Sequence, residues 1–296
     1  RQVEFSPSLF DYAQMGFNVP YREKTQSGIT LLDCSGTPFY QNQYPGFQYQ
    51  SFATIPPLIL NALLFIEDRH LLDDTCPLNN PAVDWPRFVN AAISQLGKGI
   101  GIQEHGSGGS TLATQVEKYR HSPDGRTSSA TNKIQQMLSA SVRAYLWGPL
   151  TLAARQQIAL TYFNSVPLAA APGYGEVHGL GDGLRVWFAA DPVEVSRLLT
   201  RTDELYTDLP AQALALRQVV ALLIAHRRPS YYLRQGREDL ESMTDSHLRL
   251  LAQERIIPER LKEAALAQHL TFRNFSEHSA VTRVDSNKAR YVARGR

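Results

Sequence analysis

The sequence has little of several features that would assign it to a special class of protein. It contains two cysteines among 296 residues, and Cys34 and Cys76 lack a metal-ligand spacing, so a disulfide framework and a cysteine metal site are excluded. The excess of basic over acidic side chains is only +2, which excludes a polybasic nucleic-acid binder. The longest apolar run, Leu58 to Ile66, is about half the roughly 18–20 residues that a membrane-spanning helix needs. One disulfide and two free thiols remain as alternatives for the cysteines.

The composition that is present is that of a folded protein. Hydrophobic residues make up 43% of the chain and charged residues 20%, which is enough apolar surface to bury a core. The chain begins at Arg1 with neither an initiator methionine nor a signal-peptide pattern. We therefore expect a mature or excised soluble piece of a protein.

The residue pattern predicts a mainly helical chain with one small β element near its start. Ile29–Leu32 and Pro38–Tyr40 flank a glycine turn and are typical of a hairpin. Apolar residues then recur at helical spacing, and helices are expected over 110–120, 131–147, 151–164, 210–225, 238–253 and 258–269, with others ending at Glu67 and lying near 85–96 and Leu184. We expect an entrance segment at 1–50, a core at 51–235, C-terminal helices of the same domain at 236–270 and a polar tail at 271–296.

Glu67 is the first candidate for chemistry. It follows the apolar stripe of its helix, at the point where the helix leaves the core. A carboxylate in such a place can act as a general acid or base. The alternative is an exposed carboxylate at a helix end, paired with a basic neighbour such as Arg69.

A glycine-rich loop that leads into a helix is the second candidate. The loop 106–109 precedes Ser110, and Thr111, Gln115 and Lys118 then share one helix face. Backbone N–H groups at a helix start, a hydroxyl, an amide and an ammonium in one line would suit a pyrophosphate. The alternative is a serine N-cap followed by a solvated polar face.

The next two helices carry further polar candidates. Lys133, Gln136 and Arg143 share one face of the helix over 131–147, and the apolar residues expected to form its buried stripe are Ile134, Leu138, Val142 and Leu146. Asn164 ends the following helix. The alternative to a functional role is that it is simply the C-cap of that helix. The histidines show no metal spacing, and the motifs of a serine transpeptidase are missing.

Taken in order, these segments resemble the family 51 glycosyltransferases, the peptidoglycan polymerases found alone or at the front of class A penicillin-binding proteins. The resemblance covers roughly residues 28 to 270. Its motifs are Ile55-Pro56-Pro57, Glu67-Asp68, Gly109-Ser110-Thr111 with Gln115 and Lys118, Lys133-Ile134, Tyr162-Phe163-Asn164, Gly173-Tyr174-Gly175, Trp187-Phe188 and the segment from Ala221 to Pro229.

This resemblance implies both a fold and a reaction. The fold is lysozyme-like, helical and composed of two lobes. The family lengthens glycan strands from lipid II, with inversion at the anomeric carbon and undecaprenyl pyrophosphate as the leaving group. By motif match Glu67 is the general base, and the residues matched to substrate binding are Asp68, Ser110, Thr111, Gln115, Lys118, Lys133, Gln136 and Asn164. No residue is assigned as a metal ligand, and a Mg²⁺ or Mn²⁺ ion bound with the pyrophosphate is left open as a cofactor.

The resemblance also implies partners and a location. The expected partners are lipid II or a related polyprenyl-pyrophosphate sugar, the nascent glycan strand, a membrane surface and other cell-wall synthesis proteins, with no nucleic acid. The expected location is the periplasmic face of the bacterial cytoplasmic membrane. The segment 73–106, with Trp85 and Phe88, matches the jaw with which the family touches the bilayer.

The third family motif is altered in this chain. Where the family has Arg-Lys-x-x-Glu, the sequence has Asn132 and Gln136 in place of the arginine and the glutamate. An amide keeps the size of the carboxylate but can neither accept a proton nor bind a metal as a charged ligand. Three functions therefore remain open: an active polymerase, a degenerate module that binds lipid II or glycan, and a lysozyme-like enzyme that cleaves glycan with one acidic glutamate.

Overall fold

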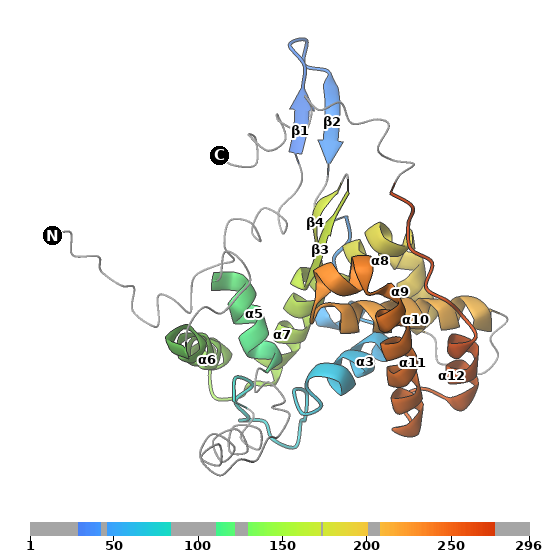
Figure 1. Ribbon diagram of the computed structural model, residues 1–296. Helices are drawn as coiled ribbons and strands as arrows, with labels where there is room; N and C mark the ends of the chain where they lie inside the picture. Colours follow the sequence, from blue (N-terminus) through green and yellow to red (C-terminus); the bar gives the residue numbers. More distant parts are fainter. Residues whose placement is uncertain are drawn as a thin grey trace. The chain divides into compact units, whose positions relative to one another are not determined.

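A computed structural model describes residues 29–42, 46–83, 111–121, 130–172, 174–200 and 208–275 (Figure 1). The elements in chain order are β1 (Ile29–Leu32), β2 (Pro38–Asn42), the 3-10 helix η1 (Phe52–Thr54), α3 (Pro57–Glu67), α5 (Leu112–His121), α6 (Ala130–Tyr145), α7 (Leu152–Ser165), β3 (Pro167–Ala171), β4 (Gly175–His178), α8 (Leu180–Phe188), α9 (Pro192–Thr200), α10 (Leu209–Ala225), the π-helix η3 (Tyr231–Gln235), α11 (Arg237–Gln253) and α12 (Glu259–Leu266).

The predicted fold class, mainly α with a small β element near the N-terminus, is confirmed. β1 and β2 form the expected antiparallel hairpin, and Gly36 adopts a positive φ in its turn. The expectation of a single β element was incomplete, because β3 and β4 form a second antiparallel pair. The sequence of β3 is alanine-rich and has low strand propensity, so its residue types do not predict a strand. Its shape is determined by pairing with β4 and by the positive φ of Ala169. The helix expected near 85–96 lies outside the described residues.

The chain divides into two compact units. Among the described residues, the first unit contains those within 67–162, and the second contains those within 29–66 and 163–275. α3 therefore belongs to the second unit up to Ile66, and its last residue, Glu67, opens the first. The domain boundaries expected at 50, 235 and 270 stay predictions.

The first unit is built on α5, α6 and the part of α7 up to Tyr162 (Figure 1). Ala82, Ala113 and Ala140 are nearly inaccessible and form a core cluster with Val83 and Ile158. Side chains this small allow the backbones of helices to approach each other closely. The backbones of α5 and α6 therefore lie close together around Ala113 and Ala140.

The buried face of α6 differs from the one expected. Ile134 and Leu138, two members of the predicted apolar stripe, are 58% and 48% exposed. The buried side includes Gln136, Ser139 and Ala140 instead. The prediction was wrong because it assumed that apolar side chains face the core. The inward face of α6 is set by polar bonds to α5 and by small residues.

A buried carboxylate connects α5 to α6. The side chain of Glu117 on α5 is 2% exposed, and its Oε1 accepts a hydrogen bond of 2.6 Å from Nε of Arg143 on α6. Its Oε2 accepts a hydrogen bond of 2.8 Å from the hydroxyl of Ser139. Nε of Arg120, one turn further along α5, lies 3.5 Å from Oε1. Both carboxylate oxygens are thus used, and the ion pair fixes the register of the two helices.

The segment that follows Glu67 is held by α7 and the residue before it. Arg155, which is fully buried, donates hydrogen bonds to the carbonyl groups of Leu71, Asp73 and Cys76. Thr151 donates to two further carbonyls, with its backbone N–H to position 77 and its hydroxyl to position 79. Residues 71–79 have no regular secondary structure, so these side chains supply partners that a helix or sheet would otherwise give.

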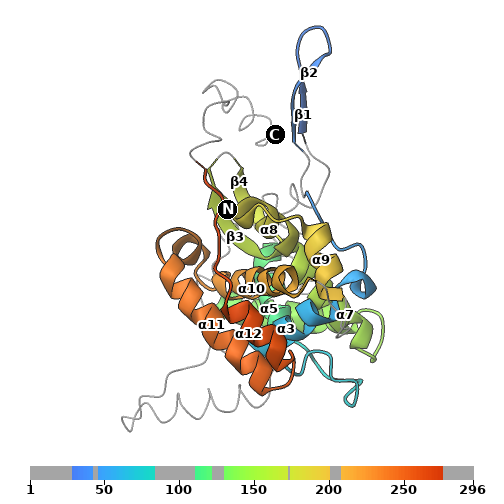
Figure 2. The ribbon, with the colours of Figure 1, turned by 90° about the vertical axis from the view of Figure 1, so that its right-hand side faces the viewer.

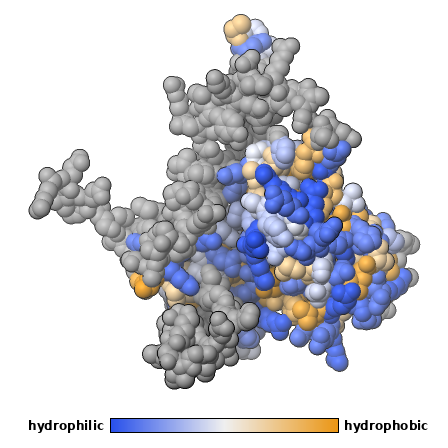
Figure 3. Space-filling view, viewed as in Figure 1, coloured by the Kyte–Doolittle hydropathy of each residue, from blue (hydrophilic) through white to orange (hydrophobic). Residues whose placement is uncertain are grey.

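The second unit is organised around α10. This helix contacts α8, α9, α11 and α12, and from Ala213 to Ala225 all but one of its residues are buried (Figure 2). A helix that is apolar on nearly every side needs such cover. Hydrophilic side chains occupy much of the face of this unit seen in Figure 3, with smaller hydrophobic areas between them. Among the described residues, no helix is both long and apolar enough to cross a membrane.

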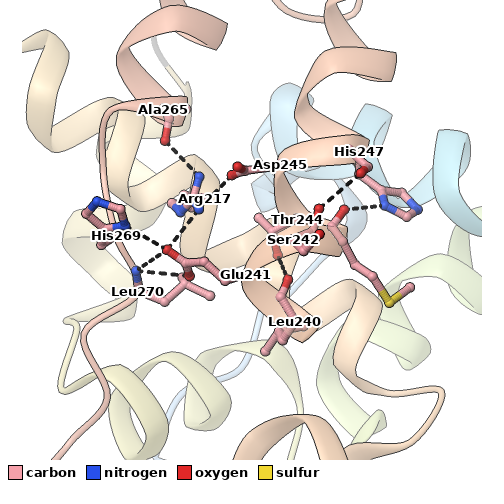
Figure 4. A network of polar contacts seen from close by, with 12 residues as sticks. Arg217, Leu240, Glu241, Ser242, Thr244, Asp245, His247, Ala265, His269 and Leu270 are labelled. Carbon is pink, nitrogen blue, oxygen red and sulfur yellow. Dashed lines mark hydrogen bonds and ion pairs between the residues drawn. The ribbon is translucent and has the colours of Figure 1, made fainter. Parts of the chain in front are cut away.

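One buried arginine joins three helices of the second unit. Arg217 of α10 donates to the carbonyl of Ala265 in α12, and its Nη2 lies 2.9 Å from Glu241 and 2.7 Å from Asp245 of α11 (Figure 4). Glu241 also accepts a hydrogen bond from the backbone N–H of Leu270. The chain after α12 is thereby tied to α11. Residues 271–275, expected to begin the polar tail, continue along α8, where the Arg273 N–H donates to the Trp187 carbonyl.

The Glu117 ion pair generates a prediction about stability. Glu117→Gln removes the charge that faces two arginines, and breaking a fully buried pair costs about 3–5 kcal/mol. Because the Arg143 side chain is 25% exposed, we expect a smaller loss of about 1–3 kcal/mol in the free energy of unfolding. Chemical denaturation followed by circular dichroism measures it.

A matched control uses an ion pair on the surface. Glu194 and Arg197 pair on α9, with both side chains about half exposed, so Glu194→Gln should change stability by no more than about 0.5 kcal/mol. Adding Arg143→Gln to Glu117→Gln should recover part of the loss, since it removes one uncompensated charge. Equal stability of Glu117→Gln and Glu194→Gln would contradict this role of Glu117.

Candidate active site

The carboxylate at the end of α3 contacts the polar face of α5. Nε2 of Gln115 donates a hydrogen bond of 3.0 Å to Oε2 of Glu67. Both side chains are half-buried, and they are 48 residues apart in the chain. The simple alternative for Glu67, an exposed carboxylate at a helix end, does not describe this arrangement. The hydrogen bond restricts rotation of the carboxylate and connects two of the motifs.

The start of α5 has the capping geometry expected of a helix N-terminus. The Thr111 hydroxyl accepts a hydrogen bond from the backbone N–H of Thr114, and the Thr114 hydroxyl donates to the Thr111 carbonyl. Thr111 is buried, so its hydroxyl acts as a cap in this structure. Ser110 and the glycine loop before it lie outside the described residues, and their proposed contact with a pyrophosphate stays a prediction.

Lys118 lies about one helical turn after Gln115 on the same side of α5. Its side chain is half-buried, and burial lowers the pKa of its ammonium group from the ordinary value. Its Nζ lies 5.9 Å from the centre of the Tyr119 ring. The residues of the apolar face beside it, Leu112 and Val116, are buried as expected. Hence the side of α5 whose Gln115 amide contacts Glu67 also carries, one turn further on, a partly desolvated cation.

The candidates on α6 differ from each other in burial. Gln136 is 4% exposed, whereas Lys133, one turn earlier, is exposed. Gln136 therefore belongs to the buried side of α6, which faces α5 at the level of Ser139. Lys133 carries its charge at the surface. Lys133, Gln136 and Arg143 were expected on one face of α6. In the structure Gln136 and Arg143 point toward the interior of the first unit, and Lys133 does not.

Asn164 belongs to the second unit, where its amide has a clear structural role. Its Oδ1 accepts a hydrogen bond of 3.0 Å from the Tyr49 N–H, and its Nδ2 donates one of 2.9 Å to the Tyr49 carbonyl. Asp182 accepts hydrogen bonds from the N–H groups of Gly46 and Phe47 nearby. Burial raises the pKa of the Tyr49 hydroxyl to about 12. Asn164 thus holds the 46–49 segment, and its contact with substrate stays a prediction.

Sequence reasoning missed the residues that support the site. Glu117 and Arg155 match no family motif, yet both are nearly inaccessible charged residues that organise the segments around Glu67 and α5. A signal for Glu117 was present, because it lies beside Val116 toward the buried side of an amphipathic helix. Asp68, which the resemblance assigns to substrate, is half-buried, and its carbonyl accepts a hydrogen bond from Leu71.

The described residues offer poor ligands for a divalent cation. Within the described ranges, no group of three or more His, Cys, Asp or Glu side chains could hold a metal ion. Gln136 supplies a neutral amide, which is not a charged ligand. The residues described here do not fit a protein-held cation, and we derive no step through one. Cys34 and Cys76 are both exposed and not bonded to each other.

The chain was compared with known proteins. A search of curated proteins finds no match. A family described as transglycosylase matches residues 36–254, which includes Glu67, the α5 and α6 motifs and Asn164. This span covers most of the chain and both compact units. The chain therefore belongs to the transglycosylase family, the family 51 glycosyltransferase domain of class A penicillin-binding proteins.

Proposed function

We propose that this protein is a peptidoglycan glycosyltransferase that lengthens glycan strands from lipid II. The observation that carries the proposal is the 3.0 Å hydrogen bond that brings Gln115 of α5 to the Glu67 carboxylate. It joins the candidate base to the helix suited to a pyrophosphate. Membership of the transglycosylase family supports glycosyl transfer in cell-wall synthesis in general.

In this proposal Glu67 is the general base. It takes the proton from the 4-hydroxyl of the acceptor sugar as that oxygen attacks C1 of the donor. The C1–O bond to the pyrophosphate breaks, undecaprenyl pyrophosphate leaves, and the configuration at C1 inverts. Gln115 holds one carboxylate oxygen, which limits the orientations from which Glu67 can accept the proton.

Residues of α5 and α6 assist the leaving group in this proposal. The Lys118 ammonium is half-buried, and a desolvated cation stabilises developing negative charge more strongly than one in water. Thr111, Ser110 and the N–H groups at the helix start add hydrogen-bond donors for phosphate oxygens. Lys133 adds an exposed charge one turn before Gln136.

We further infer a location and partners from the substrate. A polyprenyl-pyrophosphate donor is held in a membrane, so the protein would work at the periplasmic face of the bacterial cytoplasmic membrane. The nascent strand and other cell-wall synthesis proteins would be its partners. The segment with Trp85 and Phe88, which lies outside the described residues, is proposed to touch the bilayer.

A second function is favoured by one observation. Gln136, which stands where the family has a carboxylate, is 4% exposed and part of the packed side of α6. A residue integrated into the interior in this way is compatible with a module that binds lipid II or glycan without turnover. Cleavage of glycan is less well supported, because a hydrolase has no evident use for the pyrophosphate-suited face of α5.

Replacement of the base tests the mechanism. Glu67→Gln preserves the shape of the side chain and can still bond Gln115, but it cannot accept a proton. Loss of a general base typically lowers a rate about 10²–10⁴-fold. The full chain, reconstituted in vesicles with labelled lipid II, should therefore form polymer at a rate reduced by that factor.

Asp74→Asn is the matched control for this experiment. Asp74 is an exposed carboxylate seven residues after Glu67 and has no assigned role. We expect the polymerisation rate of Asp74→Asn to stay within about twofold of the rate of the unmodified protein. Robust polymerisation that is equally fast in Glu67→Gln would refute the assignment of the base.

Gln136 distinguishes an enzyme from a binding module. If the amide only weakens assistance to the leaving group, Gln136→Glu should raise polymerisation above that of the unmodified protein. The control is Gln135→Glu, which adds the same charge to the neighbouring half-buried position of α6. A binding module would show no turnover in any of these variants while it still binds lipid II.

The lowered pKa of Lys118 predicts how binding depends on pH. Burial disfavours the charged ammonium, so its charge is lost at a pH below the ordinary value of about 10.4. Affinity for a soluble pyrophosphate-linked sugar should therefore fall as the pH rises toward 10. In Lys118→Arg it should stay level, since a guanidinium keeps its charge. Isothermal titration calorimetry at several pH values measures the difference, and identical profiles would contradict a contact by Lys118.

A further inference from the structure

The candidate base is followed by a segment that belongs to no helix or strand. Glu67 is the last residue of α3, and residues 68–79 form turns without regular secondary structure. The carbonyl groups in the final turn of a helix have no partners within that helix, so the end of a helix is held less firmly than its middle. The position of Glu67 therefore depends on the contacts of the residues after it.

Two short turns begin directly after α3. The N–H of Leu71 donates a hydrogen bond of 3.2 Å to the carbonyl of Asp68, and the N–H of Asp73 donates one of 3.2 Å to the carbonyl of His70. The Asp73 carboxylate accepts hydrogen bonds from the N–H and the hydroxyl of Thr75, at 3.0 Å and 2.6 Å. Local bonds of this kind shape the segment, and its place in the first unit needs a contact from another element.

Arg155 of α7 supplies that contact. Its side chain is fully buried, and Nη1 donates hydrogen bonds of 3.0 Å and 2.7 Å to the carbonyl groups of Leu71 and Asp73. Nη2 donates one of 3.1 Å to the carbonyl of Cys76. A guanidinium has its N–H donors in one rigid plane, so a single side chain can hold three carbonyl groups in one arrangement. The segment is thus attached to α7 soon after Glu67.

The buried charge of Arg155 makes this attachment strict. A charge that is removed from water is costly unless hydrogen-bond partners replace the water. Here the carbonyl oxygens at positions 71, 73 and 76 replace it. A displaced segment would withdraw those oxygens from a guanidinium in the interior, and a buried group without its partners costs more than a lost surface contact. One conformation of the segment is therefore strongly favoured.

Glu67 has a further contact on the side of α5. Nε2 of Gln115 donates a hydrogen bond of 3.0 Å to Oε2 of Glu67, and this bond is kept only while the backbone at Glu67 stays at the same distance from α5. The segment 67–79, α5 and Arg155 all belong to the first unit. Movement of the segment after Glu67 would therefore change the orientation of the carboxylate.

We propose that Arg155 is a positioning residue for Glu67. By holding the carbonyl groups at positions 71, 73 and 76, it sets the orientation in which the Glu67 carboxylate meets the hydroxyl of the acceptor. Arg155 touches no reacting atom and acts only through the segment. The catalytic consequence rests on the proposed function, whereas the effect on the carboxylate does not. Misplacement of a reacting group by about 1 Å can lower a rate about 10²-fold.

Carboxylate footprinting measures the effect on Glu67 without any turnover. The full chain is treated with a carbodiimide and glycine ethyl ester, which convert accessible carboxylates to amides, and the rate at residue 67 is read by mass spectrometry of peptides. Arg155→Lys keeps the charge but loses the planar fork that binds three carbonyl groups. We expect Glu67 to be labelled at least about threefold faster in this variant, because the segment opens locally. Asp74, which is already exposed, is the internal reference.

Arg217→Lys is the matched control. Arg217 is also nearly inaccessible and also donates to a main-chain carbonyl, that of Ala265, but it belongs to the second unit. Both variants should lower the denaturation midpoint, and only Arg155→Lys should raise the labelling rate of Glu67. Equal labelling of Glu67 in the two folded variants, as judged by circular dichroism, would overturn the proposal. Arg155→Gln, which buries no charge, should give the same result as Arg155→Lys and replaces it if the lysine variant does not fold.

Polymerisation kinetics test the catalytic consequence. With the full chain in vesicles that contain labelled lipid II, Arg155→Lys should lower kcat about 10–100-fold and leave KM within about threefold, since the contacts with substrate are kept. Glu67→Gln removes the group on which Arg155 acts. In that background Arg155→Lys should lower the residual rate by less than about twofold, because two changes that act through one group are not additive. Fully additive losses, or a rise in KM alone, would contradict a positioning role.

The outcomes separate this inference from the proposed function. Faster labelling of Glu67 in Arg155→Lys, with no polymer formed by the unmodified protein, would contradict the proposed function and support the hold of Arg155 on the carboxylate. Polymer formed by the unmodified protein, with labelling of Glu67 unchanged in Arg155→Lys, would support the function and overturn the role of Arg155.

Discussion

The first unit depends on one buried carboxylate. Glu117 uses one oxygen for the Arg143 guanidinium and the other for the Ser139 hydroxyl, and these two bonds join α5 to α6. The neighbouring core residues are alanines, whose side chains have little shape with which to set the register. A buried ion pair adds little net stability by itself, but its directionality specifies one arrangement of two helices. The positions of Gln115 and Lys118 follow from that arrangement.

The two faces of α5 have separate chemistry. On one face Gln115 donates to Glu67, and Lys118 carries a partly desolvated charge. On the other face Glu117 and Arg120 line a large cavity with apolar walls. The segment after Glu67 adds a second constraint, because Arg155 binds three of its carbonyl groups.

The sequence predicts the elements better than it predicts the supporting contacts. The hairpin at β1 and β2, the helix that ends at Glu67 and the helix bounds of α5, α7 and α10 agree with the expectation to within a few residues, because hydrophobic period and turn residues are local signals. The face of α6 could not be predicted in this way, since Ile134 and Leu138 are exposed while Gln136 is buried. Ion pairs between helices, such as Glu117 with Arg143, depend on tertiary placement. Motif order identified Glu67 and Gln115, and only the structure shows that they touch.

The central claim is that the protein transfers glycan from lipid II rather than only binding it. The most direct measurement incubates the full, membrane-reconstituted chain with lipid II labelled in both the sugar and the polyprenyl group, and follows the two labels separately. The account predicts that each sugar unit added to polymer releases one undecaprenyl pyrophosphate, and that each new linkage has the opposite configuration at C1 from the donor. Lipid II that stays intact while it binds saturably to the protein would contradict the account.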